Sequence, residues 1–189
     1  MILIIDCGSN KTKYIEQIVY EFIDTRVVSL MDFQKDDLNE IQGVILSGAP
    51  ILVTEVDTTP YLEKMKWILT TKLPVFGICF GHQLIGLLHG AFANRMREDR
   101  DWQVIESFVD SPLFKRLPNE FRMMEDHCEA ISIPPGFELV ASSDACVNEA
   151  MQHREKLLFG VQFHPEVSGN HGAVVLENFV TVCSKTIES

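Results

Sequence analysis

A cysteine between two glycines is the residue of this chain that is best placed to do chemistry. Cys79 lies in the segment Gly77-Ile78-Cys79-Phe80-Gly81, after one short apolar run and before another. This G-x-nucleophile-x-G pattern is typical of a nucleophile elbow, a tight strand-to-helix turn in which small neighbours relieve crowding. The following helix would offer free N–H groups and the positive end of its dipole, and both favour a thiolate. The elbow predicts a nucleophilic thiol, although a buried structural cysteine explains the elbow by itself equally well.

A thiol nucleophile needs a base, and the base needs a partner that orients it. His164 and Glu166 stand two positions apart in the segment GVQFHPEV, which follows an apolar, strand-like run. In an extended segment the side chains of such a pair point to the same side, so the carboxylate can hold the imidazole and stabilise its charged form. By itself the pair also fits an exposed histidine beside a solvated glutamate. Combined with Cys79, it predicts a triad of Cys79, His164 and Glu166.

The triad needs elements that bring its members together, and the apolar pattern supplies them. Short apolar runs alternate with helical spacing in the first half of the chain, which favours an α/β fold with a largely parallel sheet. Such sheets place their sites at the carboxyl ends of the strands. Strands are predicted at 2–5, 27–28, 43–46, 74–78, 102–108, 121–124, 137–141 and 157–163. Helices are predicted at 61–69, 81–88 and 173–182, and around a buried stripe of Tyr14, Ile15, Ile18, Val19 and Phe22.

Composition and charge narrow the classes of function. The 189 residues are 46% hydrophobic and 23% charged, as in ordinary globular proteins, and we predict a single domain over residues 1–189. The net charge of −11 argues against binding to nucleic acids or anionic membranes, which usually needs a basic face. No apolar run approaches the ~20 residues that cross a bilayer, and the opening MILIIDCGSN lacks the basic region of a signal peptide. We therefore expect a cytoplasmic protein without membrane association.

The cysteines argue against a metal site or a disulfide framework. Their number is odd, their spacings are wide and no C-x-x-C pair occurs. They are Cys7, Cys79, Cys128, Cys146 and Cys183. We therefore expect no metal in this chain and a reducing compartment. We also expect the acidic run 98–101 to be a solvated face, and His82 and His89 to be structural or surface residues.

The motifs around the triad resemble a known family. GICFGHQ followed by GVQFHPEV resembles the class I (triad) glutamine amidotransferases, and the resemblance spans nearly the whole chain. Further segments, among them IIDCGSNKTKYI, ILSGAP and HCEAISIPPGFELVASSDAC, are similar to the glutaminase subunits or domains of GMP synthases. The resemblance implies one domain with a flavodoxin-like, largely parallel central sheet, flanked by helices and extended by antiparallel strands.

The resemblance also implies a reaction. Cys79 would attack the side-chain carboxamide of L-glutamine, and backbone N–H groups of Phe80 and of the turn at Gly48 and Ala49 would hold the oxyanion. His164, oriented by Glu166, would protonate the departing ammonia, and water would then release glutamate. Binding of glutamine would involve Gln83, Asp126, His127 and Cys128.

The ammonia acceptor follows from the same resemblance. Ammonia would pass to a partner synthetase of the ATP-pyrophosphatase type, which uses ATP and Mg²⁺ to convert xanthosine monophosphate to GMP. The glutaminase subunit itself would need no cofactor.

Some positions depart from the family pattern and leave other functions open. Ala49 stands where a second glycine is usual, and EDHCEAI replaces S-H-x-D-x-V, with Asp126 and Glu129 at the serine and aspartate positions. One alternative keeps the chemistry but serves an anthranilate or aminodeoxychorismate synthase, or acts as an independent γ-glutamyl hydrolase. Another alternative is a non-catalytic binding module on the same fold.

Overall fold

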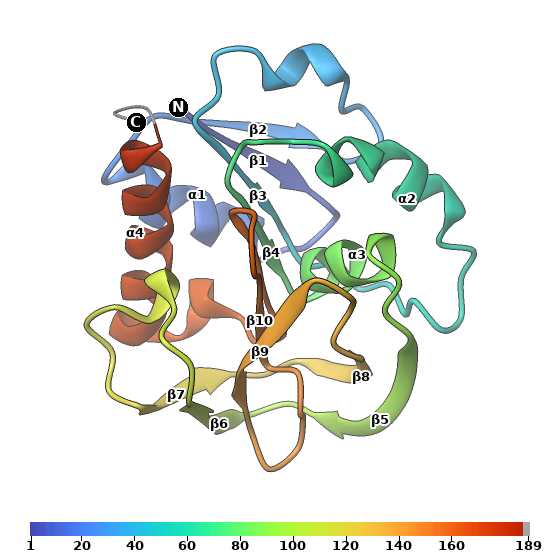
Figure 1. The fold of residues 1–189 in the computed structure, drawn as a ribbon, viewed down its shortest axis with the longest axis vertical. Coiled ribbons are helices and arrows are strands. Elements are labelled where there is room, and N and C mark those ends of the chain that lie inside the picture. Colours follow the sequence, from blue (N-terminus) through green and yellow to red (C-terminus); the bar gives the residue numbers. More distant parts are fainter. Residues whose placement is uncertain (187–189) are drawn as a thin grey trace.

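The centre of the molecule is one nine-stranded sheet, seen in a computed structural model that describes residues 1–186 (Figure 1). Its strand order is β2-β1-β3-β4-β11-β10-β9-β6-β7. The first five strands in that order are mutually parallel: β2 Thr25–Ser29, β1 Ile2–Asp6, β3 Gly43–Leu46, β4 Val75–Ile78 and β11 Leu158–Val161. The other four continue it antiparallel: β10 Ala150–His153, β9 Phe137–Ser142, β6 Trp102–Ser107 and β7 Glu120–Met124. A separate antiparallel pair consists of β5 Ala93–Asp99 and β8 His127–Ile131.

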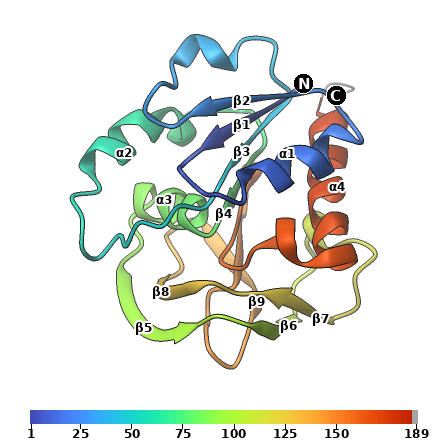
Figure 2. The same ribbon diagram turned by 180° about the vertical axis from the view of Figure 1, so that it is seen from behind.

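Helices cover both faces of the parallel half, as the two opposite views in Figures 1 and 2 show. On one face lie α1 (Thr12–Tyr20) and α4 (Gly169–Lys185), and on the other lie α2 (Thr59–Met65) and α3 (Phe80–Leu88). Alternate residues of β1 divide between these faces, because successive side chains of a strand point in opposite directions. Ile2 and Ile4 pack in the cluster that contains α1 and α4, and Leu3 and Ile5 pack in the cluster that contains α2 and α3. Burial on both faces explains why β1, β3, β4 and β11 are almost entirely apolar, whereas the edge strand β2 is largely exposed.

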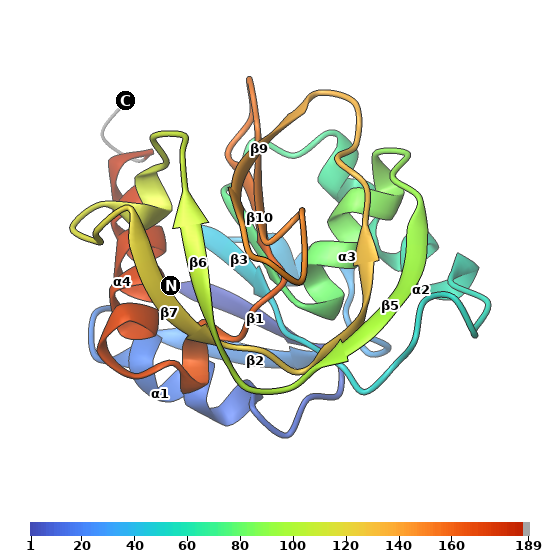
Figure 3. The ribbon, with the colours of Figure 1, turned by 90° about the horizontal axis from the view of Figure 1, so that it is seen from below.

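The parallel strands bring four loops to one edge of the sheet. β1, β3, β4 and β11 are neighbours, and their carboxyl ends are followed by Gly8, Gly48, Cys79 and His164 respectively. Chain segments that are far apart in the sequence therefore meet at the position where open α/β sheets bind ligands. The view from below shows β5 and β8 running together along the side of the molecule next to α3 (Figure 3).

The structure confirms the predicted fold class and corrects several local predictions. Tyr14 and Phe22 are exposed, so the buried stripe of α1 is narrower than expected and includes Ile15 and Val19. The predicted helix at 61–69 becomes α2 followed by a 3₁₀ turn, Lys66–Leu69, and the last helix is longer than predicted. The sequence patterns did not reveal β5, β8 and β10. No helix within residues 1–186 has the length and apolar character needed to span a membrane.

Candidate active site

Cys79 occupies a strained turn between β4 and α3. Its backbone has φ 50° and ψ −105°, a left-handed φ that costs of order 1–3 kcal/mol in a residue other than glycine. The turn is held because the Cys79 N–H donates to the Val161 carbonyl at 2.8 Å, and the Gln83 N–H donates to the Cys79 carbonyl at 3.0 Å. The flanking glycines are required by space. A Cβ at Gly77 would lie 2.5 Å from the Gly81 carbonyl carbon, and one at Gly81 would lie 2.5 Å from the Leu46 carbonyl oxygen.

His164 and Glu166 form a buried pair. The Nδ1 atom of His164 lies 2.8 Å from Oε1 of Glu166, and both side chains are almost fully shielded from solvent. The contact arises differently from the prediction. Glu166 lies in a 3₁₀ turn, Pro165–Val167, and the segment is not extended, so tight backbone curvature brings the carboxylate back to the imidazole. The His164 carbonyl accepts a 2.6 Å hydrogen bond from the Ser168 hydroxyl, which fixes the same turn.

The imidazole of His164 also meets the thiol of Cys79 across a small gap beside Gly48. A Cβ at Gly48 would lie 3.2 Å from Cε1 of His164 and 3.5 Å from Cβ of Cys79, so a side chain there would press on the imidazole and leave little room around the thiol. Burial by itself would lower the pKa of His164, but hydrogen bonds to Cys79 and Glu166 and the negative charge of both groups raise it to about 10. The imidazole is thus held in its charged form near neutral pH, and a cation beside the sulfur favours the thiolate.

The raised pKa of His164 predicts a loss of stability at alkaline pH. Since the folded-state pKa of about 10 exceeds the ordinary value of 6.5, the stabilisation is complete below pH 6.5 and disappears as the pH rises through 10. We expect the free energy of unfolding to fall by a few kcal/mol (on the order of 1.4 per pKa unit) between these limits. Denaturant titrations at pH 6, 8 and 10 measure it. In a His164→Asn variant the pH-dependent loss should be clearly smaller, and equal slopes in the two proteins would contradict the assignment.

The residues predicted to donate to an oxyanion lie in two backbone segments beside Cys79. Phe80 is the first residue of α3, and its N–H precedes the first helical hydrogen bond, which runs from Gln83 to Cys79. The turn at Gly48 and Ala49 also lies beside Cys79, because a Cβ at Gly48 would be 3.5 Å from Cβ of Cys79. Among residues 1–186, only Glu40, Cys79 and Arg116 combine a side chain with a positive φ. Ala49 therefore adopts an ordinary φ, and the alanine introduces no backbone strain at this turn.

A cavity of about 700 Å³ opens over Cys79 and His164. Of the predicted site residues, its wall includes Cys79, His164, Ala49, Gln83, Asp126, His127 and Cys128. Gly48, Phe80 and Glu166 are buried immediately behind that wall. The structure thus gathers all ten predicted residues in or directly behind one cavity, which could accept a small polar molecule beside the thiol.

Other residues of the site gave no clear signal in the sequence. The buried Gln162 amide donates to Sγ of Cys79 at 3.5 Å and accepts from the Gln83 amide at 3.2 Å, which links a wall residue to the sulfur. Lys11 and Arg100 line the cavity and pair with Asp126 at 2.6 Å and 3.4 Å. Partial burial would raise the pKa of Asp126, but the hydrogen bond and charge of Lys11 lower it overall. These residues lie on separate loops, so only the fold brings them together.

Glu129 fixes the loop that forms one wall of the cavity. Its buried carboxylate accepts hydrogen bonds from the Val53 N–H at 2.7 Å, from the Thr54 N–H at 3.1 Å and from the Thr54 hydroxyl. These contacts anchor the chain directly after residues 49–52, which line the cavity. The carboxylate at this position thus acts by positioning a wall of the cavity.

We expect Glu129→Ala to loosen that wall. Because buried N–H groups lose their acceptor, the free energy of unfolding should fall by about 2 kcal/mol. The KM for a small substrate should rise more than kcat falls, since Glu129 lines and supports the cavity and is not a member of the triad. Steady-state kinetics and denaturant titration measure both effects. Glu120→Ala, at an exposed position of β7, is the matched control, and a Glu129→Ala protein that behaves like this control would refute the role.

Comparison with known proteins decides the family. The family model described as glutamine amidotransferase class-I matches residues 3–183. The glutamine-hydrolyzing GMP synthase subunit of Methanocaldococcus jannaschii is 36% identical to this chain, with 100% of each chain covered. The protein of the same name from Methanococcus vannielii is 38% identical, with 97% of each covered. The chain belongs to the class I glutamine amidotransferase family.

Solved structures agree with this membership and confirm the resemblance that the motifs predicted. A protein of Thermoplasma acidophilum assigned as a GMP synthase subunit superimposes with a TM-score of 0.91 at 28% identity, over 99% of this chain and 95% of that one. A glutamine amidotransferase from Thermotoga maritima shares the fold, with a TM-score of 0.75 at 20% identity over 100% of this chain and 86% of that one. The elbow, the buried histidine pair and the cavity thus lie on a class I glutamine amidotransferase fold.

Proposed function

We propose that this chain is the glutaminase subunit of a GMP synthase, in which Cys79 is the nucleophile, His164 the general acid and base, and Glu166 the residue that orients His164. The observation that carries the proposal is the meeting of these three side chains at the carboxyl edge of the sheet, beside the cavity. Relatives named as glutamine-hydrolyzing GMP synthase subunits match the whole chain and support the choice of pathway.

The first half of the reaction forms a thioester. The Cys79 thiolate attacks the carboxamide carbon of glutamine, and the carbonyl oxygen becomes an oxyanion held by the N–H groups of Phe80 and Ala49. The charged imidazole of His164 then donates its proton to the amide nitrogen, the carbon–nitrogen bond breaks and ammonia leaves. Glu166 keeps Nδ1 of the ring occupied, so that Nε2 is the atom that transfers the proton.

The second half releases glutamate. Neutral His164 removes a proton from a water molecule, the resulting hydroxide attacks the thioester carbon, and the carbon–sulfur bond breaks to regenerate the thiolate. The proton taken from water stays on the imidazole, and the carboxyl group of the product loses its own proton to solvent, so the triad ends in its starting state. Gln162, which donates to the sulfur at 3.5 Å, stabilises the thiolate at the beginning and end of the cycle.

The substrate is held by polar groups spread around the cavity. The Gln83 amide, fixed by Gln162, lies on the side of the reacting thiol. Asp126 with Lys11 and Arg100 supplies both signs of charge at one place in the wall, which suits the α-amino and α-carboxylate groups of an amino acid. The segment formed by His127 and Cys128 completes this wall.

The partner in this proposal is an ATP-pyrophosphatase synthetase, which holds ATP and Mg²⁺ and converts xanthosine monophosphate to GMP. The test combines the purified chain with that synthetase, xanthosine monophosphate, ATP, Mg²⁺ and glutamine labelled with ¹⁵N in its side-chain amide. We expect ¹⁵N-labelled GMP, and no label when the chain carries Cys79→Ala. Since glutaminases of this kind are activated by their loaded partners, activity is measured with the partner present.

The same mixture distinguishes the other acceptors. If the chain transferred ¹⁵N to a chorismate-derived product with an anthranilate or aminodeoxychorismate synthase, but not to GMP, the acceptor in this proposal would be wrong. If it released glutamate at full rate without any partner and formed no complex with the synthetase, it would be an independent hydrolase.

A further inference from the structure

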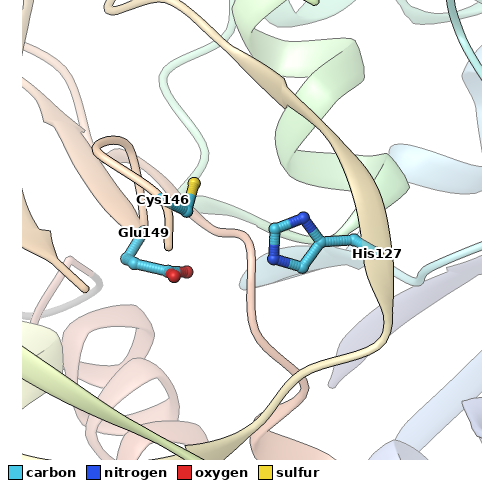
Figure 4. A group of neighbouring side chains, drawn as sticks. All are labelled: His127, Cys146 and Glu149. Atoms are coloured by element: carbon cyan, nitrogen blue, oxygen red, sulfur yellow. The ribbon is translucent and has the colours of Figure 1, made fainter. Parts of the chain in front are cut away.

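A second cluster of reactive side chains adjoins the glutamine cavity and shares His127 with its wall. His127, Cys146 and Glu149 point toward one another (Figure 4), and their ligand-type atoms all lie within 4.8 Å of one another. His127 comes from the start of β8, and the other two come from the loop between β9 and β10. All three are buried, with 7%, 3% and 0% of their surface exposed. A thiol, an imidazole and a carboxylate are the three side-chain types that bind Zn²⁺ in proteins.

The imidazole of His127 is set up as a ligand. Its Nδ1 atom lies 2.9 Å from the Glu129 carbonyl, an acceptor, so Nδ1 carries the hydrogen and Nε2 keeps its lone pair. A backbone or carboxylate acceptor on the distant ring nitrogen is the usual support of a metal-binding histidine. Within residues 1–186, Nε2 makes no hydrogen bond, although it lies 3.1 Å from a carboxylate oxygen of Glu125.

Glu125 is positioned to be the fourth ligand of a tetrahedral zinc ion. Two ligand atoms about 2.0–2.1 Å from a tetrahedral zinc lie roughly 3.3 Å apart. The 3.1 Å between Nε2 of His127 and Oε2 of Glu125 is close to that separation. The ligand-type atoms of Cys146 and Glu149 lie within 4.8 Å of that of His127, so both side chains would move inward to reach a common ion. Since His127 also lines the glutamine cavity, the cluster adjoins that cavity.

The cluster contains buried carboxylates whose negative charge must be neutralised. Asp99, Glu125 and Glu149 are buried, and no lysine or arginine in the part of the chain that the structure describes pairs with any of them. As ionised carboxylates, both Glu125 oxygens, one oxygen of Glu149 and one of Asp99 find no hydrogen-bond partner within that part, whereas a carboxyl proton would join Glu125 to Glu149. Burying carboxylates without partners is costly, so they must take up either protons or a metal.

We propose that Cys146, His127, Glu149 and Glu125 bind one Zn²⁺ ion, which joins the loop before β10 to the start of β8. Binding replaces the protons of the thiol and carboxyl groups, so the ion and three anionic ligands leave one net negative charge on the site. The loop is already held against β8, because the Asn148 amide donates to the Ile131 carbonyl at 3.3 Å. The ion would fix the segment 126–128, which forms a wall of the cavity. This proposal departs from the expectation of no metal site, which rested on the spacing of the cysteines alone, because the proposed ligands come from separate segments of the chain.

The experiment must separate this site from the active-site thiol, which can also bind zinc. We would therefore use a Cys79→Ser background, purified without a histidine tag, stripped with chelator and loaded with one equivalent of Co²⁺ or Zn²⁺. We expect one metal ion per chain after gel filtration. We also expect the near-ultraviolet charge-transfer absorption of a cobalt–thiolate bond. Adding Cys146→Ser should abolish this absorption and weaken Zn²⁺ binding at least about tenfold. Adding Cys128→Ser, at the residue next to His127, should leave both unchanged.

Two outcomes would overturn the proposal. One is a stripped protein that takes up less than one tenth of an equivalent, and the other is a cobalt–thiolate absorption that survives Cys146→Ser. If Cys146→Ser does not fold, zinc X-ray absorption of the Cys79→Ser protein decides without a further substitution. We expect one sulfur and three nitrogen or oxygen neighbours, and a shell without sulfur would refute the site.

Discussion

Cys79→Ala is expected to reduce glutamine hydrolysis by about 10⁴-fold or more, because it removes the only atom that forms the thioester while leaving the oxyanion donors in place. Alanine fits the space of the thiol, and the strained φ of 50° already exists in the native turn. The fold should therefore survive, with circular dichroism and the unfolding midpoint close to those of the native chain. Glutamate release in the presence of the loaded synthetase measures the effect.

A matched control shows that the loss comes from the nucleophile. Cys183→Ala removes a thiol that is buried on α4, apart from the glutamine cavity. It should lower stability, as truncation of a core side chain does, while glutamate release stays within a factor of about two of the native rate. If Cys79→Ala kept activity similar to that of Cys183→Ala, the assignment of the nucleophile would be wrong.

Gly172→Ala should displace the turn that carries His164 and Glu166. A Cβ at this position of α4 would lie 1.8 Å from the Pro165 carbonyl oxygen and 2.9 Å from the Ser168 Cβ, so the turn that carries the histidine pair must move. Overpacking of this kind costs about 1–3 kcal/mol. A displacement of about 1 Å in a catalytic group can cost roughly 10² in rate. We expect both losses together, measured by denaturant titration and by glutamate release.

An exposed position two residues earlier in α4 provides the matched control. Asn170→Ala changes an exposed residue in the same first turn of α4 and should have little effect on either property. A Gly172→Ala protein with native stability and activity would show that the turn Pro165–Val167 does not depend on close contact with α4. A protein that lost stability but kept the full rate would show that the imidazole tolerates this movement.

The triad was predictable because its signals are local. The elbow requires small residues at fixed distances from Cys79, and the reason is a backbone contact that the structure makes explicit at Gly81. The partnership of His164 and Glu166 was also predicted, but for an incorrect reason, since the contact depends on a 3₁₀ turn. A spacing of two residues can bring side chains together in more than one backbone conformation.

Other features could not be read from the chain because they arise from pairing between distant segments. Asp99 was expected on a solvated face, yet it is buried at the end of β5, where the ladder with β8 places it opposite His127. β5 contains four charged residues, and β8 is only five residues long with a glutamate at its centre, so neither has an apolar run that would indicate a strand. The carboxylates around Cys146 likewise come from two loops that only the antiparallel half of the sheet brings together.

The most direct test of the account is covalent labelling of the native chain, with the synthetase loaded, by a diazo-ketone analogue of glutamine. The analogue must first occupy the glutamine cavity and then meet an activated thiolate. We predict one adduct, located by peptide mass spectrometry on Cys79, prevented by excess glutamine and strongly slowed by Glu166→Gln. An adduct on another cysteine, or none under conditions that label a related glutaminase, would contradict the proposal that Cys79, His164 and Glu166 act together on glutamine.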